Sequence, residues 1–92
     1  MTINSISDFR KAVRNGAYAW PGGYPVFWLM DDGGVLAFDV CKTERHNMLE
    51  SLATNSRDGW RPVALEINWE DTEMFCAHTG ARIEAAYEEK PA

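Results

Sequence analysis

The sequence predicts a small α+β domain, in which an antiparallel sheet carries two or three helices packed mainly on one face. Three observations favour this class. Apolar residues recur at helical spacing near residues 5–15 and 43–55, two apolar runs flank an Asp-Asp-Gly-Gly turn, and residues 63–69 alternate strictly. The expected order is αββαβ with a short C-terminal element. At 92 residues the chain can build one core, so we expect one domain over residues 1–92.

The first helix is expected over residues 5–15. Ser5 is placed to cap the backbone amide of Asp8, and the Asp8 carboxylate can reach back in the reciprocal pattern of a capping box. Gly16 can adopt the left-handed conformation that ends helices. The predicted apolar face of this helix consists of Ile6, Phe9 and Val13.

Residues 17–25 combine turn-forming and aromatic residues. Pro21, Gly22, Gly23 and Pro25 exclude a helix here and indicate a loop or a short edge strand. The aromatic residues of this stretch are Tyr18, Trp20 and Tyr24. Loops rich in aromatic side chains often bind partners, so we expect Trp20 and Tyr24 to contribute to binding, with Trp20 as the best single anchor if it is exposed.

Residues 25–30 and 35–40 are predicted to form a hairpin. With Asp32-Gly33 as a two-residue turn, Leu29 would pair with Leu36 and Phe27 with Phe38 on one face. Trp28 would then pair with Ala37 on the other face, which is also apolar. Two explanations stay open for the second face: helices of the same domain cover it, which we favour, or a partner does.

The second half of the chain predicts a helix, a strand and a short final element. Thr43 can cap a helix that runs to about residue 55. The following strand would bury Val63, Leu65, Ile67 and Trp69 on one face. Residues 75–76 are expected to begin a short strand, and residues 83–87 favour a short helix over a strand. Three tryptophans are assigned to the core: Trp28, Trp60 and Trp69.

The charge of the chain excludes some partners and favours others. The net charge is −5, and Lys and Arg outnumber Asp and Glu only within residues 1–30. An acidic protein is repelled by phosphate backbones, so we expect no binding to free DNA and better complementarity to basic protein surfaces. No apolar run approaches the ~20 residues of a membrane helix, and no signal peptide is visible. The expected compartment is the cytoplasm, with both cysteines as free thiols.

Cys76 and His78 are the candidate metal ligands. Strand residues two positions apart point to the same side, and a thiolate and an imidazole are typical zinc donors. Only Cys41 and His46 are available to complete a four-ligand site. A zinc-associated adaptor domain that uses Cys76 and His78 is therefore the alternative hypothesis, whereas the preferred interpretation includes no metal, no cofactor and no catalytic site.

The chain ends in a combination of short motifs. These motifs are Asp58-Gly59-Trp60-Arg61, Asn68-Trp69-Glu70-Asp71, and the Cys-x-His-Thr-Gly-x-Arg-Ile-Glu-x-Ala-Tyr pattern that begins at Cys76. Over about residues 57–88 the chain resembles a group of small bacteriophage and prophage proteins. Relatives with cysteine in place of Thr79 would make a better metal half-site, so threonine at this position disfavours metal binding.

The resemblance implies a phage-encoded protein that acts in the host cytoplasm by occupying the surface of a host defence complex. The most plausible version is an anti-CRISPR protein that blocks target-DNA binding by a class 1 (type I) surveillance complex. Its acidic surface would compete for the lysines and arginines of that complex, and the basic first helix would contact guide-RNA phosphates. Expected contact residues are Arg10, Lys11, Arg14, Trp20, Tyr24, Glu70, Asp71 and Glu73.

Overall fold

The fold places helices and a C-terminal segment around an antiparallel sheet. The structure, a computed structural model, describes residues 1–19 and 23–87. Its elements are α1 (Ile6–Asn15), β1 (Tyr18–Ala19), β2 (Tyr24–Met30), β3 (Val35–Ala37), α2 (Val40–Thr43), α3 (Arg45–Thr54) and β4 (Pro62–Ile67). The predicted α+β class is confirmed, and the predicted order holds apart from the short elements β1 and α2. Within the described ranges, no helix combines the length and the apolar character needed to cross a membrane.

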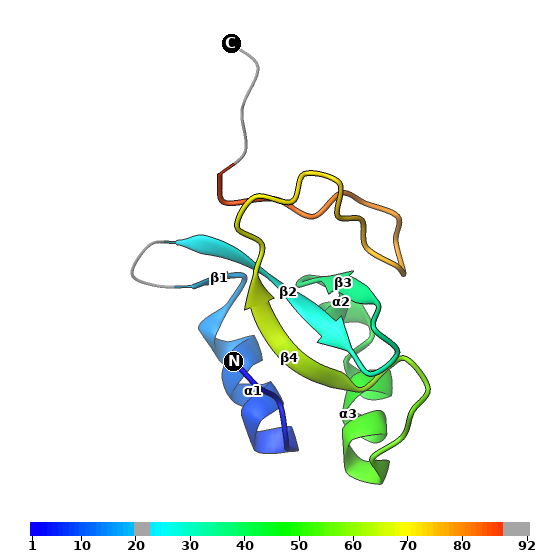
Figure 1. Ribbon diagram of the computed structural model, residues 1–92. Coiled ribbons are helices and arrows are strands. Elements are labelled where there is room, and N and C mark those ends of the chain that lie inside the picture. The colour runs from blue at the N-terminus through cyan, green and yellow to red at the C-terminus, as the bar shows by residue number, and fades with distance from the viewer. Residues whose placement is uncertain (20–22, 88–92) are drawn as a thin grey trace.

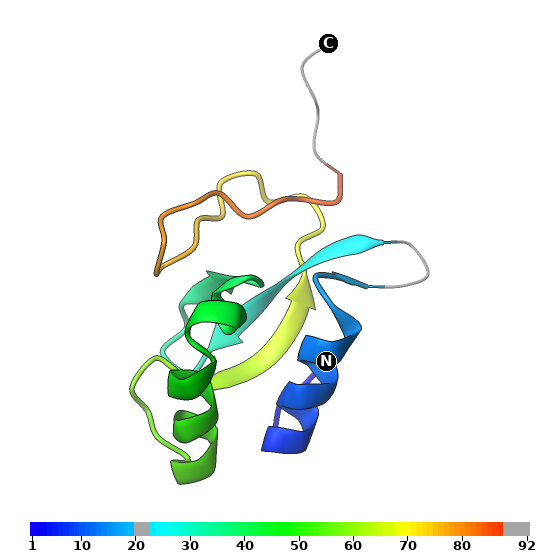
Figure 2. The same cartoon turned by 180° about the vertical axis from the view of Figure 1, so that it is seen from behind.

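β2 is the central strand of the sheet. Along one edge it pairs first with β1 and then with β3, and along the other edge it pairs with β4, in every case antiparallel. Residues 1–3 add to the outer edge of β4, where Ile3 N donates to Val63 O at 2.9 Å. The C-terminal segment, residues 68–87, lies on the side of the sheet away from α1 and α3 (Figures 1 and 2).

The predicted hairpin exists, but its predicted register is wrong by one residue. Leu29 pairs with Val35 and Trp28 with Leu36, because the loop has three residues instead of two. Met30 N donates to Gly34 O at 2.9 Å, and Gly33 N donates to Met30 O at 3.0 Å. Gly33 has φ +84°, the left-handed conformation that closes a three-residue hairpin. Asp-Asp-Gly therefore forms the loop.

The second face of the hairpin is covered by the same chain. Trp28 is fully buried, and its ring lies 5.2 Å from the ring of Phe9 on α1 and stacks on Phe38 at 5.6 Å. The indole Nε1 donates to Phe38 O at 3.1 Å, so the buried polar atom is satisfied. Of the two explanations for this face, the structure supports cover by the helices of the domain.

The first helix agrees closely with its prediction. Asp8 N donates to the Ser5 hydroxyl at 3.1 Å, and the Asp8 carboxylate accepts from Asn4 N at 3.0 Å. The helix ends at Gly16, which has φ +88°. Of the predicted apolar face, Phe9 is buried and Ile6 and Val13 are half-buried, and Ala12 is buried beside them.

The second helix begins earlier than predicted, and Thr43 does not cap it. A helical turn, α2, already starts at Val40, and the Thr43 hydroxyl donates back to Val40 O at 3.3 Å. Glu44 interrupts the helix with φ −111° and ψ 21°, and α3 follows. The predicted end at Asn55 is confirmed, because this residue adopts the left-handed conformation with φ 51°.

Three sequence predictions for the chain after residue 60 are wrong. The predicted buried row of β4, Val63, Leu65 and Ile67, is only half-buried, and the buried residues are Pro62 and Ala64, which alternate with it. Trp69 lies beyond the end of β4 and is 46% exposed. Residues 83–87 form no helix, because their backbone amides bond to the segment after β4. Ile83 N donates to Met74 O at 2.8 Å, and Tyr87 N donates to Trp69 O at 2.7 Å. The predicted strand at Phe75-Cys76 is reduced to an isolated bridge between Phe75 and Arg82.

Asn68 holds this C-terminal segment together. Its side chain is 2% exposed, and Nδ2 donates to the carbonyls of Asp71 at 3.0 Å, Ile83 at 3.4 Å and Glu84 at 3.1 Å. Oδ1 accepts from Asp71 N at 3.2 Å. The Asn68 backbone bonds to Pro25 O at 3.1 Å and accepts from Ala86 N at 2.8 Å. One buried residue therefore ties residues 71 and 83–86 to the start of β2.

We expect Asn68→Ala to lower the free energy of unfolding by about 2 kcal/mol, because it leaves buried carbonyl groups without donors. In a domain of this size such a loss lowers the melting temperature by about 10 °C. Thermal and urea unfolding followed by circular dichroism measure the effect. The matched control is Asn47→Ala, which removes a single 2.7 Å hydrogen bond to Glu44. Equal losses in the two variants would contradict the special role of Asn68.

Candidate functional site

Three aromatic side chains form an exposed cluster where the C-terminal segment meets the start of β2. The rings of Trp69 and Tyr87 stack with centroids 5.9 Å apart and planes 15° from parallel. Tyr24 packs against both, at 4.7 Å from Trp69 and 6.4 Å from Tyr87. Trp69 is 46% and Tyr87 64% exposed, whereas Tyr24 is half-buried. We call these three residues the aromatic cluster.

The aromatic cluster owes its position to backbone hydrogen bonds. Trp69 directly follows the buried Asn68, and its carbonyl accepts the 2.7 Å hydrogen bond from Tyr87 N. Tyr24 begins β2 and is paired with Ala19 of β1. The cluster thus joins residues far apart in the sequence and is held by sheet pairing on one side and by the Asn68 hydrogen bonds on the other.

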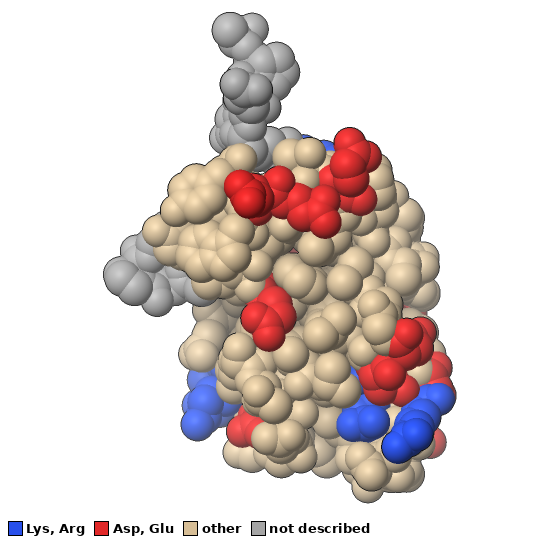
Figure 3. Space-filling model, in the orientation of Figure 1, with Lys and Arg blue, Asp and Glu red and all other residues tan. Residues whose placement is uncertain are grey.

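Carboxylates lie next to this cluster along the chain. Glu70, Asp71 and Glu73 are all exposed, and the Asp71 carboxylate accepts from Glu73 N at 2.9 Å, which gives the turn a defined shape. Acidic side chains gather over the C-terminal segment, at the top of Figure 3, beside a small basic patch, whereas the larger basic groups in this view lie at the opposite end. We call the aromatic cluster together with Glu70, Asp71 and Glu73 the acidic-aromatic face.

Two tyrosines near this face are neutral at physiological pH. Tyr18 donates to a Glu84 carboxylate oxygen at 3.1 Å, and this hydrogen bond, with the charge of Glu84, raises the pKa of Tyr18. The hydrogen bond with Tyr24 raises the pKa of Tyr87. Both hydroxyl groups therefore remain protonated, and each takes part in a hydrogen bond within the chain.

The structure separates the predicted contact residues into two groups. Tyr24 joins Glu70, Asp71 and Glu73 on the acidic-aromatic face. Arg10, Lys11 and Arg14 are exposed on α1, which lies on the other side of the sheet (Figure 1). Trp20 lies outside the described residues. The sequence analysis did not identify Trp69 and Tyr87 as surface residues. The acidic residues that follow Trp69 directly could have indicated that Trp69 is exposed, because such a run is unusual at the end of a buried strand.

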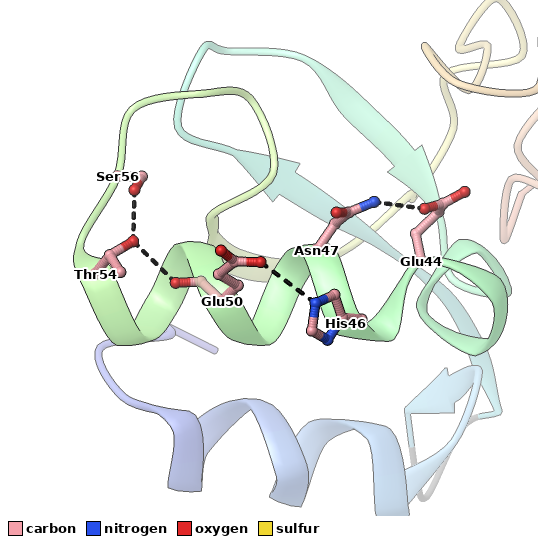
Figure 4. A network of polar contacts seen from close by, with 6 residues as sticks. All are labelled: Glu44, His46, Asn47, Glu50, Thr54 and Ser56. Carbon is pink, nitrogen blue, oxygen red and sulfur yellow. Dashed lines mark hydrogen bonds and ion pairs between the residues drawn. The ribbon is translucent and has the colours of Figure 1, made fainter.

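The structure does not assemble the predicted metal donors into one site. His78 Nε2 lies 3.3 Å from Glu44 Oε1, and the His78 ring packs edge-on against Trp60 at 5.3 Å. His46 pairs with Glu50 along α3 at 3.4 Å, as Figure 4 shows. Over residues 1–19 and 23–87, no three side chains of His, Cys, Asp or Glu are grouped as a metal site would require.

Both cysteines are free and buried. Burial raises the pKa of Cys41, helped by the charge of Asp39. Burial also acts to raise the pKa of Cys76, but hydrogen bonds from the Thr79 side chain and from the backbone of Ala37, Thr79 and His78 outweigh it, so the pKa of Cys76 is lowered. The backbone of Cys76 closes the turn that follows it, because Gly80 N donates to Cys76 O and Cys76 N donates to Ala81 O, both at 2.8 Å.

Two cavities are further candidates for the functional site. One, of about 470 Å³, lies between the end of α1 and β4 and is lined mainly by apolar groups. A second, of about 170 Å³, lies beside Trp60 and His78. Neither contains one of the predicted contact residues, whereas the acidic-aromatic face contains four of them.

Comparisons of the chain with protein-family models, with curated proteins and with solved structures find no match.

We expect the purified protein to bind no stoichiometric zinc, because Cys76 and His78 have no further donors grouped with them in the described residues. Its melting temperature should be the same with excess chelator and with one equivalent of zinc, within about 1 °C. Elemental analysis and calorimetry measure both quantities. One zinc per chain, together with a chelator-induced loss of stability that Cys76→Ser reproduces, would contradict this expectation and restore the adaptor-domain hypothesis.

Proposed function

We propose that the protein is a small binding protein that acts by occupying the surface of a macromolecular partner. The observation that carries this proposal is the acidic-aromatic face, where two large aromatic side chains remain about half exposed although the fold holds them in place. Exposed, pre-positioned tryptophan and tyrosine side chains are typical energetic anchors of interfaces. Such a mode of action needs no active site.

The specific version of the proposal is a phage-encoded inhibitor of a host defence complex. It is supported by the resemblance of residues 57–88 to phage proteins and by the net charge of −5. Class 1 (type I) CRISPR surveillance complexes are the preferred target, because complexes that hold guide RNA and target DNA present basic channels to which an acidic protein is complementary. The protein would then act in the host cytoplasm as an anti-CRISPR protein.

The basic residues of α1 have a separate role in this proposal. Arg10, Lys11 and Arg14 are exposed on the side of the sheet away from the acidic-aromatic face. A ribonucleoprotein partner offers both basic protein surface and exposed guide-RNA phosphates. The two oppositely charged surfaces could therefore contact different components of one complex, which would favour a ribonucleoprotein over a uniformly basic protein.

We expect the protein to inhibit target-DNA binding by a purified type I surveillance complex at about one molecule per binding site. Trp69→Ala should weaken inhibition about 30-fold, the loss that corresponds to removing an interface anchor of ~2 kcal/mol. Fluorescence anisotropy of labelled target DNA measures the effect. The matched control is Phe75→Ala, because Phe75 lies in the same segment and is 50% exposed. If a saturating amount of the protein leaves target-DNA binding unchanged, the CRISPR version is rejected. If Trp69→Ala and Phe75→Ala weaken inhibition equally, the acidic-aromatic face is not the contact surface.

A further inference from the structure

We propose that the acidic-aromatic face docks an arginine-bearing segment of a protein partner, with a guanidinium group against the aromatic cluster and paired with the neighbouring carboxylates. This inference rests on the proposed function, since it names the chemistry by which the same face would recognise its partner. It concerns a protein segment and not a nucleic acid. Three features of the face favour such an occupant: its charge, the form of its aromatic surface, and its rigidity.

The charge around the face selects a cationic occupant. Residues 68–87 contain four acidic residues and one arginine. Glu70 and Asp71 follow Trp69 directly, and the Asp71 carboxylate is held by its 2.9 Å hydrogen bond from Glu73 N. Phosphate groups are repelled from such a surface, whereas a basic segment is attracted to it and steered towards it.

The aromatic surface selects arginine over lysine. A guanidinium group is planar and weakly hydrated, so it stacks on aromatic rings while it donates paired hydrogen bonds to a carboxylate. Trp69 and Tyr87 present nearly parallel rings, and Glu70 and Asp71 follow Trp69 directly in the chain, so the face contains both kinds of group that a guanidinium uses. Lysine carries a strongly hydrated point charge and gains less from a flat aromatic surface.

The exposure of the rings indicates a macromolecular occupant. Small-molecule sites bury most of their ligand in a concave pocket, whereas Trp69 and Tyr87 lie on the surface with 46% and 64% of their area exposed. A protein segment covers such rings from outside and excludes water from its own side. Because Tyr87 N bonds to Trp69 O and Asn68 anchors the turn, little conformational entropy is lost when a partner docks.

The test is a titration of the isotope-labelled protein with two synthetic peptides, one of alternating glycine and arginine and one of alternating glycine and lysine. Nuclear magnetic resonance follows the indole N–H of Trp69 and the backbone amides. We expect saturable shifts at Trp69, Glu70 and Tyr87, and an affinity for the arginine peptide about threefold to tenfold higher than for the lysine peptide. Equal affinities, or shifts confined to other surfaces, would overturn the inference.

Variants separate stacking from charge. Trp69→Ala should reduce the affinity for the arginine peptide about tenfold and remove its preference over the lysine peptide. Glu70→Gln, an exposed change that keeps the fold, should reduce the affinity about twofold to fivefold, more at low salt than at high salt. Its control is Glu50→Gln on α3, which makes the same change in net charge away from the face. Equal effects of these two glutamine variants would show that only net charge matters and would overturn the inference.

The outcomes for the inference and for the proposed function are distinguishable. Arginine-selective binding at Trp69 without any effect on the surveillance complex would refute the CRISPR version and leave the docking site standing. Inhibition of the complex that Trp69→Ala leaves unchanged, with no selective peptide shifts, would refute the docking site and leave the inhibitor function standing. A single-stranded RNA oligonucleotide that shifts Trp69 more strongly than either peptide would also refute a protein segment as the occupant.

Discussion

The carboxamide of Asn68 makes hydrogen bonds on which the C-terminal segment, residues 68–87, depends. Residues 68–87 contain neither a helix nor a ladder of several paired residues, so their backbone groups cannot satisfy one another in a regular pattern. The buried amide supplies donors to carbonyls of Asp71, Ile83 and Glu84, and the Asn68 backbone joins them to β2. A segment of irregular structure thereby acquires a fixed shape on the sheet.

The two charged surfaces of the molecule consequently have different physical supports. The basic residues of α1 stand on a helix that packs through Phe9 against the fully buried Trp28, so apolar burial sets their orientation. The acidic-aromatic face stands on a segment that also buries Cys76, Ile83 and Ala85, and the hydrogen bonds of Asn68 and between Tyr87 and Trp69 add to this burial. Apolar packing is non-directional, whereas hydrogen bonds fix angles. The acidic-aromatic face therefore has directional support in addition to apolar burial.

Local sequence signals predicted which helices and strands form better than they predicted strand register and helix boundaries. The cap at Ser5 and the glycine after Asn15 bounded α1 correctly, because both act within one turn of the helix. The hairpin was recognised from its turn, but Asp-Asp-Gly-Gly is compatible with loops of two or three residues. The observed three-residue loop, with Gly33 in the left-handed conformation, shifts every pair by one. Thr43 resembled a cap, yet the chain was already helical from Val40.

The sequence by itself determined the α+β class, the order of the main elements, the first helix and the acidic character of the chain, since these follow from periodicity, capping and composition. Only the tertiary structure decided that Trp69 leaves the sheet for the surface and that residues 83–87 form no helix. Alternation alone would continue the strand through Trp69, and alanines favour a helix near Tyr87. Hydrogen bonds from Asn68 and between residues 69 and 87 override both preferences, because long-range partners satisfy the backbone groups that local structure would use.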